Sequence, residues 1–289
     1  METMRTLRDR AGTLRGSHRP GAIVVALAVM AAAAPVPSHT QASAAGDRVP
    51  VIVELFTSEG CSSCPPADDV LTKLVTTQPV ANAEIIALGE HVDYWDRLGW
   101  RDPFSSAAFT ARQSEYAAQT FRTDNIYTPQ LIVDGREAVV GSDYRAATAA
   151  IARATAPGGA AAAARLRISV KAEHNPSRAS VHVITRVDPP DASMSKVAAD
   201  VFLAVVEDGL VTQVKRGENK GRELRHTAVV RSLTPIGAMS DSGPWSADTT
   251  VQFPPDWNAA RSRVVAFVQE RAKRKMLGAV TASLTNKAG

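Results

Sequence analysis

The segment Cys61-Ser62-Ser63-Cys64 holds the only two cysteines of the 289-residue chain. A structural zinc site made of thiolates needs a second CxxC pair or two histidines at ligand spacing, and the sequence contains neither. A single pair also excludes a framework of several disulfides. Any thiol chemistry of this chain must therefore come from one CxxC pair.

This pair stands between a predicted strand and a predicted helix. Val51 to Phe56 is a β-branched and apolar run with the length of a buried strand. Pro66 to Val75 has apolar residues at helical spacing, and Asp68 and Asp69 suit the positive end of that helix. The sequence thus places both thiols at a strand-to-helix turn.

Strands and helices continue to alternate after this turn. The predicted elements are a strand at 84–88, a helical segment at 105–121, strands at 131–133 and 138–140, and a helix at 143–154. This order predicts an α/β domain over residues 45–156, with a sheet that is partly parallel and an insertion at about residues 90–125.

A break at residues 157–164, with Pro157-Gly158-Gly159 and an alanine run, is the predicted linker. Residues 165–289 contain short β-rich segments separated by turn residues, which predicts an all-β, immunoglobulin-like sandwich. We expect this second domain to be a contact surface for a protein partner or a dimer. Arg216 to Asn219 and His226 are interpreted as a charged hairpin between strands, because nothing there pairs a nucleophile with a base.

Residues 1–44 are interpreted as a secretory signal peptide. Five arginines precede an apolar stretch, and Ala42-Ser43-Ala44 suits cleavage. The run from Ala22 to Ala34 is shorter than the roughly 20 residues that a bilayer requires, which favours cleavage over a retained anchor. Cleavage would lower the formal charge from +4 to about +1, so the basic composition is no argument for nucleic-acid binding.

Longer motifs carry a family resemblance. The segments VELFTSEGCSSCPPAD, HVDYWDRLGWRDPF, YTPQLIVDG and RGENKGRELRH resemble a family of secreted bacterial thioredoxin-like proteins of unknown function. The resemblance covers most of the chain after the signal and implies an α/β thioredoxin-like domain followed by the all-β sandwich. It implies no established substrate.

The resemblance also implies roles for individual residues. Cys61 would be the attacking thiol and Cys64 the resolving thiol. Glu54 would be a buried acid that relays a proton for the resolving cysteine, and the alternative is a solvated edge carboxylate. Pro129 would be cis and face the disulfide, which leaves the backbone of Thr128 free to bond an extended substrate.

The chain departs from the thioredoxin pattern at Pro65-Pro66. In thioredoxin the helix effectively starts at the first cysteine, whereas a residue before proline, here Cys64, is biased away from the α region, so we expect the helix to begin about one turn later than in thioredoxin. That start would give the Cys61 thiolate less help from the helix. Ser62 and Ser63 would either donate compensating hydrogen bonds or act only as small polar turn residues.

His91, Tyr94 and Trp95 lie in the insertion. His91 follows a predicted strand and, with the two thiols, would form a site for a soft metal such as Cu(I); the alternative is an ordinary hydrogen-bonded histidine. Tyr94 and Trp95 either wall a substrate groove or pack the insertion down.

These observations predict an exported, periplasmic or secreted, thiol-disulfide oxidoreductase-like protein. Its partners would be protein or small-molecule thiols and disulfides, with no cofactor, no nucleic acid and no membrane span after signal cleavage. Two alternatives stay open. One is a copper(I) metallochaperone using Cys61, Cys64 and His91, and the other is a non-catalytic binding protein with a structural disulfide.

Overall fold

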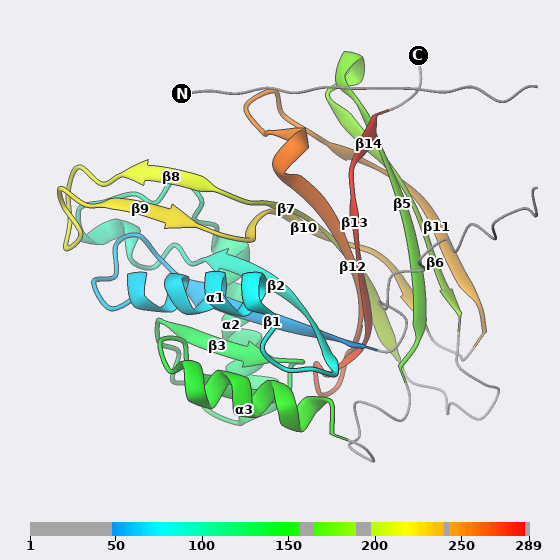
Figure 1. Ribbon diagram of the computed structural model, residues 1–289, viewed down its shortest axis with the longest axis horizontal. Coiled ribbons are helices and arrows are strands. Elements are labelled where there is room, and N and C mark those ends of the chain that lie inside the picture. Colours follow the sequence, from blue (N-terminus) through cyan, green and yellow to red (C-terminus); the bar gives the residue numbers. More distant parts are fainter. Residues whose placement is uncertain (1–47, 157–164, 189–197, 240–242, 287–289) are drawn as a thin grey trace, which may run out of the picture. The chain divides into compact units, whose positions relative to one another are not determined.

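The computed structural model describes residues 48–156, 165–188, 198–239 and 243–286 (Figure 1). These described residues form one compact unit. The elements of the first half are β1 (Val49–Thr57), α1 (Pro65–Thr77), β2 (Ala83–His91), η2 (Asp96–Leu98), α2 (Ala107–Glu115), the π-helix η3 (Tyr116–Phe121), β3 (Gln130–Val133), β4 (Glu137–Val140) and α3 (Tyr144–Ala154). The predicted helices and strands of this half are confirmed, with ends that differ by a few residues.

The second half consists of strands and two short 3₁₀ turns in its described residues. Its elements are β5 (Arg167–Asn175), η4 (Pro176–Arg178), β6 (Ser180–Asp188), β7 (Ala199–Glu207), β8 (Leu210–Gln213), β9 (Glu223–His226), β10 (Val229–Met239), β11 (Trp245–Gln252), η5 (Ala259–Arg261), β12 (Ser262–Glu270), β13 (Met276–Ser283) and β14 (Thr285–Asn286). The predicted β-rich content is confirmed, whereas β9 and β14 were not predicted.

One mixed sheet contains strands from both halves of the chain. Its order is β13-β12-β7-β10-β2-β1-β3-β4. Strand β1 runs parallel to β2 and antiparallel to β3. A four-stranded sheet, β11-β6-β5-β14, and the β8–β9 hairpin complete the described β-structure.

The predicted fold class, an α/β thioredoxin-like domain followed by a separate immunoglobulin-like sandwich, is wrong. Strand β10 from the second half pairs with β2 from the first half, so the eight-stranded sheet runs through both predicted domains. The structure is mostly β-sheet, with three α-helices in its described residues. The local periodicity of β2 predicted a strand correctly but held no information about its distant partner.

The two halves of the chain approach each other closely at Gly89. It pairs in parallel with Val229, and its backbone N–H donates a hydrogen bond to the carbonyl oxygen of Ala228 at 2.7 Å. A Cβ at Gly89 would lie 3.2 Å from that oxygen and 3.3 Å from the carbonyl oxygen of Thr227. The missing side chain therefore allows the second half to approach β2 and to place β9 beside α1.

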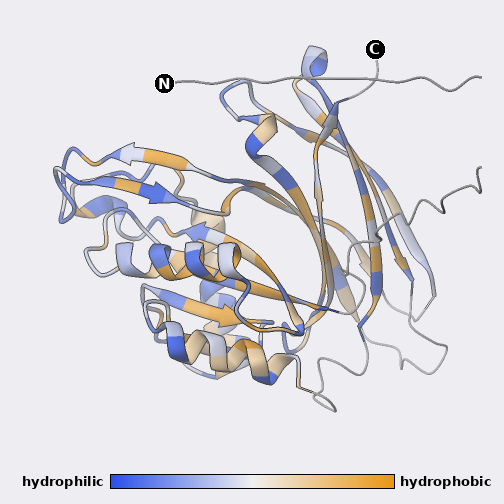
Figure 2. Ribbon diagram, in the orientation of Figure 1, coloured by the Kyte–Doolittle hydropathy of each residue, from blue (hydrophilic) through white to orange (hydrophobic). Residues whose placement is uncertain are grey.

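The layers around the sheet determine where the CxxC turn lies. Helices α1 and α3 cover one face near β1 and β3, and α2 lies behind the opposite face (Figure 1). Hydrophobic residues concentrate on the central strands, whereas the tip of the β8–β9 hairpin is hydrophilic (Figure 2). Most of β1 and all of β3 are buried, so the turn that follows β1 starts from a rigid base.

The predicted signal peptide, residues 1–44, and the predicted linker, residues 157–164, lie outside the described residues. Among the residues that are described, no helix has both the length and the apolar character needed to cross a membrane.

Candidate functional site

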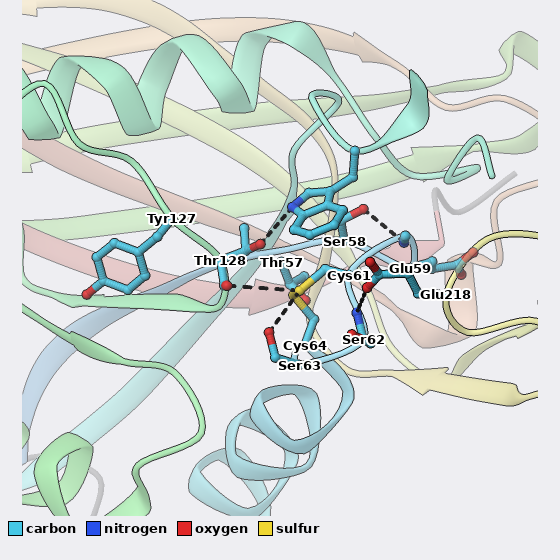
Figure 3. The surroundings of a disulfide bond; sticks show 12 residues. Thr57, Ser58, Glu59, Cys61, Ser62, Ser63, Cys64, Tyr127, Thr128 and Glu218 are labelled. Atoms are coloured by element: carbon cyan, nitrogen blue, oxygen red, sulfur yellow. Dashed lines mark hydrogen bonds between the residues drawn. A yellow bond between two sulfur atoms is a disulfide. The ribbon is translucent and has the colours of Figure 1, made fainter. Parts of the chain in front are cut away.

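Cys61 and Cys64 form a disulfide at the turn between β1 and α1 (Figure 3). Their Cα atoms are 5.4 Å apart. Both cysteines have an exposed fraction of 0%, while Ser62 and Ser63 between them are exposed. The surface at this point is therefore made by the two serines, with the sulfur atoms directly beneath.

Helix α1 begins immediately after the second cysteine. Cys64 has αR geometry, with φ −76° and ψ −39°, and its carbonyl oxygen accepts hydrogen bonds from the N–H groups of Ala67 and Asp68. The expected late start is confirmed, since α1 begins at Pro65, one turn after Cys61, but the expected bias of Cys64 away from the α region is wrong. Pro65 occupies the first helical position, where a proline lacks only an N–H that has no partner in the helix. The disulfide consequently lies at the positive end of α1.

The loop before β3 lies beside Cys61. The Thr128–Pro129 peptide bond is cis, as the family resemblance implied. The carbonyl oxygen of Thr128 is 4.0 Å from Sγ of Cys61, and Oγ of Ser63 lies 3.3 Å from the same sulfur (Figure 3). A disulfide sulfur has no hydrogen, so the Ser63 hydroxyl is the group that can donate to it.

Trp95 belongs to the wall around this loop. Its indole Nε1–H donates a hydrogen bond to Oγ1 of Thr128 at 2.8 Å. The Tyr94 hydroxyl donates a hydrogen bond to the side-chain oxygen of Gln113 at 3.3 Å, and burial raises the pKa of this tyrosine. Of the two predicted groove residues, Trp95 thus bonds the loop beside the sulfur atoms, and Tyr94 bonds α2.

The β8–β9 hairpin supplies the other wall. Nδ2 of Asn219 donates hydrogen bonds to the carbonyl oxygens of Glu59 and Cys61 at 2.8 and 2.9 Å. The backbone N–H of Ser62 donates to Oε2 of Glu218 at 3.0 Å (Figure 3). The Ser62 side chain, and after it this N–H, lowers the pKa of the Glu218 carboxyl. The segment interpreted as a charged hairpin therefore touches the CxxC turn directly.

A buried polar cluster lies below the turn and is centred on Glu59. The Glu59 carboxylate accepts a hydrogen bond from Nε1 of Trp100 at 2.8 Å and lies 3.0 Å from Nε2 of His226. Its backbone N–H donates to Oδ2 of Asp102 at 2.8 Å. Nδ1 of His226 is 3.6 Å from the Asp68 carboxylate on α1. The cluster joins the turn, the insertion, the helix and the hairpin.

Charge pairing fixes the protonation of this cluster. Burial alone would lower the pKa of His226, but the carboxylates of Asp68 and Glu59 outweigh burial and raise it to about 10. Burial would raise the pKa of Asp102, yet His91 and the N–H groups of Glu59 and Phe104 lower it overall. At neutral pH His226 is therefore a cation beside two acids.

Glu54 is buried on the other face of β1. Its carboxylate accepts hydrogen bonds from Nε of Arg112 at 2.6 Å and from the Tyr116 hydroxyl at 2.5 Å. Arg112 belongs to α2 and Tyr116 to η3. The hydrogen-bond and ion-pair partners of Glu54 among the described residues do not include either cysteine. The alternative of a solvated carboxylate is wrong because Glu54 is fully buried. Its role as a proton relay stays a prediction.

His91 lies within the polar cluster. Its Nδ1 is 2.7 Å from Oδ2 of Asp102, and its ring centroid is 4.9 Å from that of His226. The described residues include no group of three or more His, Cys, Asp and Glu side chains arranged to hold a metal ion. The structure therefore brings His91 together with His226 and Asp102, and it shows no contact of His91 with the two thiols.

Sequence reasoning missed the contribution of Glu59, Asp102, Glu218, Asn219 and His226. Asp102 lies in HVDYWDRLGWRDPF, and the last three belong to RGENKGRELRH. A usable signal was present, since these are two of the four segments that carry the family resemblance. All four segments meet around the CxxC turn.

Comparisons with known proteins give the family. Residues 52–269 match the family described as "Protein of unknown function (DUF1223)", and the chain belongs to this family. A crystal structure of a protein from Agrobacterium tumefaciens is similar, with 26% identity and a TM-score of 0.62, covering 85% of this chain and 98% of that one. HBP35 of Porphyromonas gingivalis has 12% identity and a TM-score of 0.59, covering 82% and 76%, which shows a similar fold. No curated protein matches the chain.

Proposed function

We propose that the protein is a thiol-disulfide oxidoreductase that uses Cys61 and Cys64. The observation that carries this proposal is the position of the disulfide, which lies at the N-terminus of α1 and beside the carbonyl oxygen of Thr128. In this respect the site resembles those of thioredoxin-like oxidoreductases.

The proposed exchange proceeds in two balanced steps. The Cys61 thiolate attacks one sulfur of a substrate disulfide, so that a mixed disulfide forms and the other substrate sulfur leaves as a thiolate. Cys64 then attacks Sγ of Cys61, closes the internal disulfide and releases the second substrate thiolate, which takes a proton from water. The substrate gains two electrons and the CxxC pair loses two. The reverse sequence oxidises a substrate dithiol, and a second thiol or disulfide couple restores the starting state.

Two groups support the thiolate form of Cys61. The positive end of α1 stabilises negative charge near its first turn. The Ser63 hydroxyl, 3.3 Å from Sγ, is placed to donate a hydrogen bond to a thiolate, which is a stronger acceptor than a disulfide sulfur. Both effects lower the pKa of a thiol and favour the reduced pair.

The compartment is part of the proposal. A disulfide persists in oxidising environments such as the periplasm or the cell exterior. Together with the predicted signal over residues 1–44, the disulfide supports export of the protein.

The test is to trap the mixed disulfide. With a disulfide-containing protein such as insulin as substrate, Cys64→Ser should accumulate a covalent adduct, because the resolving thiol is missing. Cys61→Ser serves as the matched control and should accumulate none, because the proposal assigns the attack on the substrate to Cys61 and only the closing step to Cys64. Equal or absent adducts in both variants would contradict the assignment of Cys61 as the attacking thiol.

The full burial of both cysteines favours a second candidate function. In this alternative the protein is a binding protein, and its disulfide only holds the turn that carries Glu59 and Ser62. Alkylation of the reduced, folded protein separates the two candidates. A binding protein would react no faster at neutral pH than an ordinary thiol with a pKa of about 8.5, whereas the oxidoreductase would react faster.

A further inference from the structure

Five exposed cations surround the CxxC turn. Arg97 and Arg101 lie in the loop after β2, and Lys215, Arg216 and Lys220 lie at the tip of the β8–β9 hairpin. None of the five has an ion-pair partner within the described ranges. We call these five residues the basic rim.

Three contacts hold the two segments of the rim to each other and to the turn. Asn219, between Glu218 and Lys220, donates to the carbonyl oxygen of Cys61 at 2.9 Å. Glu218 accepts from the N–H of Ser62 at 3.0 Å. A Cβ at Gly217 would lie only 3.1 Å from Cβ of Trp100, so the hairpin tip packs against the loop that carries Arg101. The rim is therefore part of the surface next to the disulfide.

Three acids belong to the segments of the rim or lie close to them in the chain. Glu218 is bonded to Ser62, the Glu223 carboxylate lies 2.5 Å from Arg225, and Asp96 accepts from the Ser105 hydroxyl at 2.7 Å. The hydrogen bonds to Ser62 and Ser105 leave the negative charges of Glu218 and Asp96 in place, but the five cations outnumber these two acids. The rim therefore keeps a net positive charge, and a group of like charges on one surface attracts ions of the opposite sign.

An apolar side chain lies within the same loop. Leu98, between Arg97 and Arg101, has an exposed fraction of 55%. A small anion would use the cations but not Leu98. A polypeptide segment that carries both acidic and apolar side chains would use the whole surface.

We propose that the substrate of this site is an acidic polypeptide segment that places its cysteine at the CxxC turn while its carboxylates lie on the basic rim. This inference rests on the proposed function. The carboxylates bring the substrate to the turn, and the exchange itself uses only the sulfur atoms of the substrate, Cys61 and Cys64.

Three peptides of equal length test the inference. Each contains one cysteine in a mixed disulfide with the same small thiol, and its flanking residues are acidic, neutral or basic. We expect the reduced protein to react at least about tenfold faster with the acidic peptide than with the basic one at low salt. The preference should shrink at physiological salt, because the screening length falls from about 30 Å at 0.01 M to about 8 Å at 0.15 M.

Charge reversal locates the effect. Lys215→Glu combined with Arg216→Glu should abolish the acidic preference. Lys171→Glu combined with Arg178→Glu is the matched control, because it makes the same change in net charge at exposed positions of β5 and of the η4 turn that follows it. Equal rates for the three peptides, or the same loss of preference in the control, would overturn the inference.

A binding experiment separates this inference from the proposed function. Labelled peptides with serine in place of cysteine are titrated into the oxidised protein, and fluorescence anisotropy measures binding. If no peptide exchanges but the acidic one binds through Lys215 and Arg216, the oxidoreductase is contradicted and the acidic docking surface stands. If all peptides exchange at equal rates, the oxidoreductase stands and the acidic substrate is contradicted.

Discussion

Asn219 donates a hydrogen bond to the carbonyl oxygen of Cys61, although 158 positions separate the two residues in the chain. The same nitrogen donates to the carbonyl oxygen of Glu59, and Asn219 is buried. A hairpin from the second half of the chain thus holds the backbone of the redox turn. The geometry of the thiols consequently depends on residues far from the CxxC pair.

Replacing this asparagine tests how much the turn depends on the hairpin. Asn219→Asp removes the donor and leaves two buried carbonyl oxygens without it, so we expect the free energy of unfolding to fall by on the order of 2 kcal/mol. Urea unfolding of the oxidised protein measures the loss. Asn125→Asp, at an exposed position, is the matched control and should change little. An equally stable Asn219 variant would contradict a structural role for this bond.

The cation at His226 makes stability depend on pH. Its pKa is about 10 in the folded protein and 6.5 in the unfolded reference, so its contribution is complete below pH 6.5 and is lost as pH rises toward 10. The full effect is on the order of 5 kcal/mol. Urea unfolding at about pH 6 and about pH 9.5 should show this decline, and His226→Gln should flatten it. Equal declines in wild type and variant would show that other groups cause the pH dependence.

Trp95 should control access to the buried disulfide. Trp95→Phe keeps an aromatic ring but removes the hydrogen bond to Thr128, which is worth about 1 kcal/mol. We expect the disulfide to be reduced by a small phosphine about fivefold faster in this variant, provided that opening of the Thr128 loop limits the reaction. Trp245→Phe, on β11, should react at the wild-type rate. Unchanged reduction of the Trp95 variant would exclude this loop as the barrier.

Arg112 should be the most sensitive residue of the buried charge group between α2 and the sheet. Its Nε lies 2.6 Å from the Glu54 carboxylate and 3.4 Å from that of Glu90. Arg112→Met leaves a buried carboxylate without its partner and should cost about 3 to 5 kcal/mol in thermal or urea unfolding. Arg97→Met, at an exposed and unpaired position, should cost little.

Glu54 and Glu90 should respond differently to the same change. Burial and the neighbouring Glu54 raise the pKa of Glu90 well above its usual range, so Glu90 retains a proton that a free carboxyl would lose. Glu90→Gln therefore replaces one neutral group by another and should alter stability little. Glu54→Gln removes the charge that pairs with Arg112 and should destabilise the fold. Equal effects of the two substitutions would contradict this assignment of charge.

Local elements were predictable because each depends on nearby residues. The apolar run at β1, the helical spacing of α1 and the strand at β3 are all visible as periodicity, and the predicted bounds of β3, 131–133, differ from the structure by one residue. The pairing of β10 with β2 was not predictable in this way. It depends on a close backbone approach at Gly89 to a strand about 140 positions away, and a lone glycine in a strand does not identify its partner.

The candidate site was predictable only in part for the same reason. Cys61, Cys64 and Pro129 belong to short motifs whose chemistry is local. Asn219 and Glu218 gain their role only when the hairpin folds against the CxxC turn. At the start of α1 a local rule failed. Pro65 biases Cys64 away from the α region, but two hydrogen bonds to the carbonyl oxygen of Cys64 outweigh this bias.

The equilibrium potential of the Cys61–Cys64 pair tests the central claim most directly. The oxidised protein is incubated in glutathione buffers of graded ratio, and the reduced fraction is measured by alkylation and mass. The account predicts a potential between about −270 and −120 mV, the range of catalytic CxxC pairs. A potential below about −300 mV, typical of structural disulfides, would contradict the proposed oxidoreductase function. It would support the alternative that the protein is a binding protein with a structural disulfide.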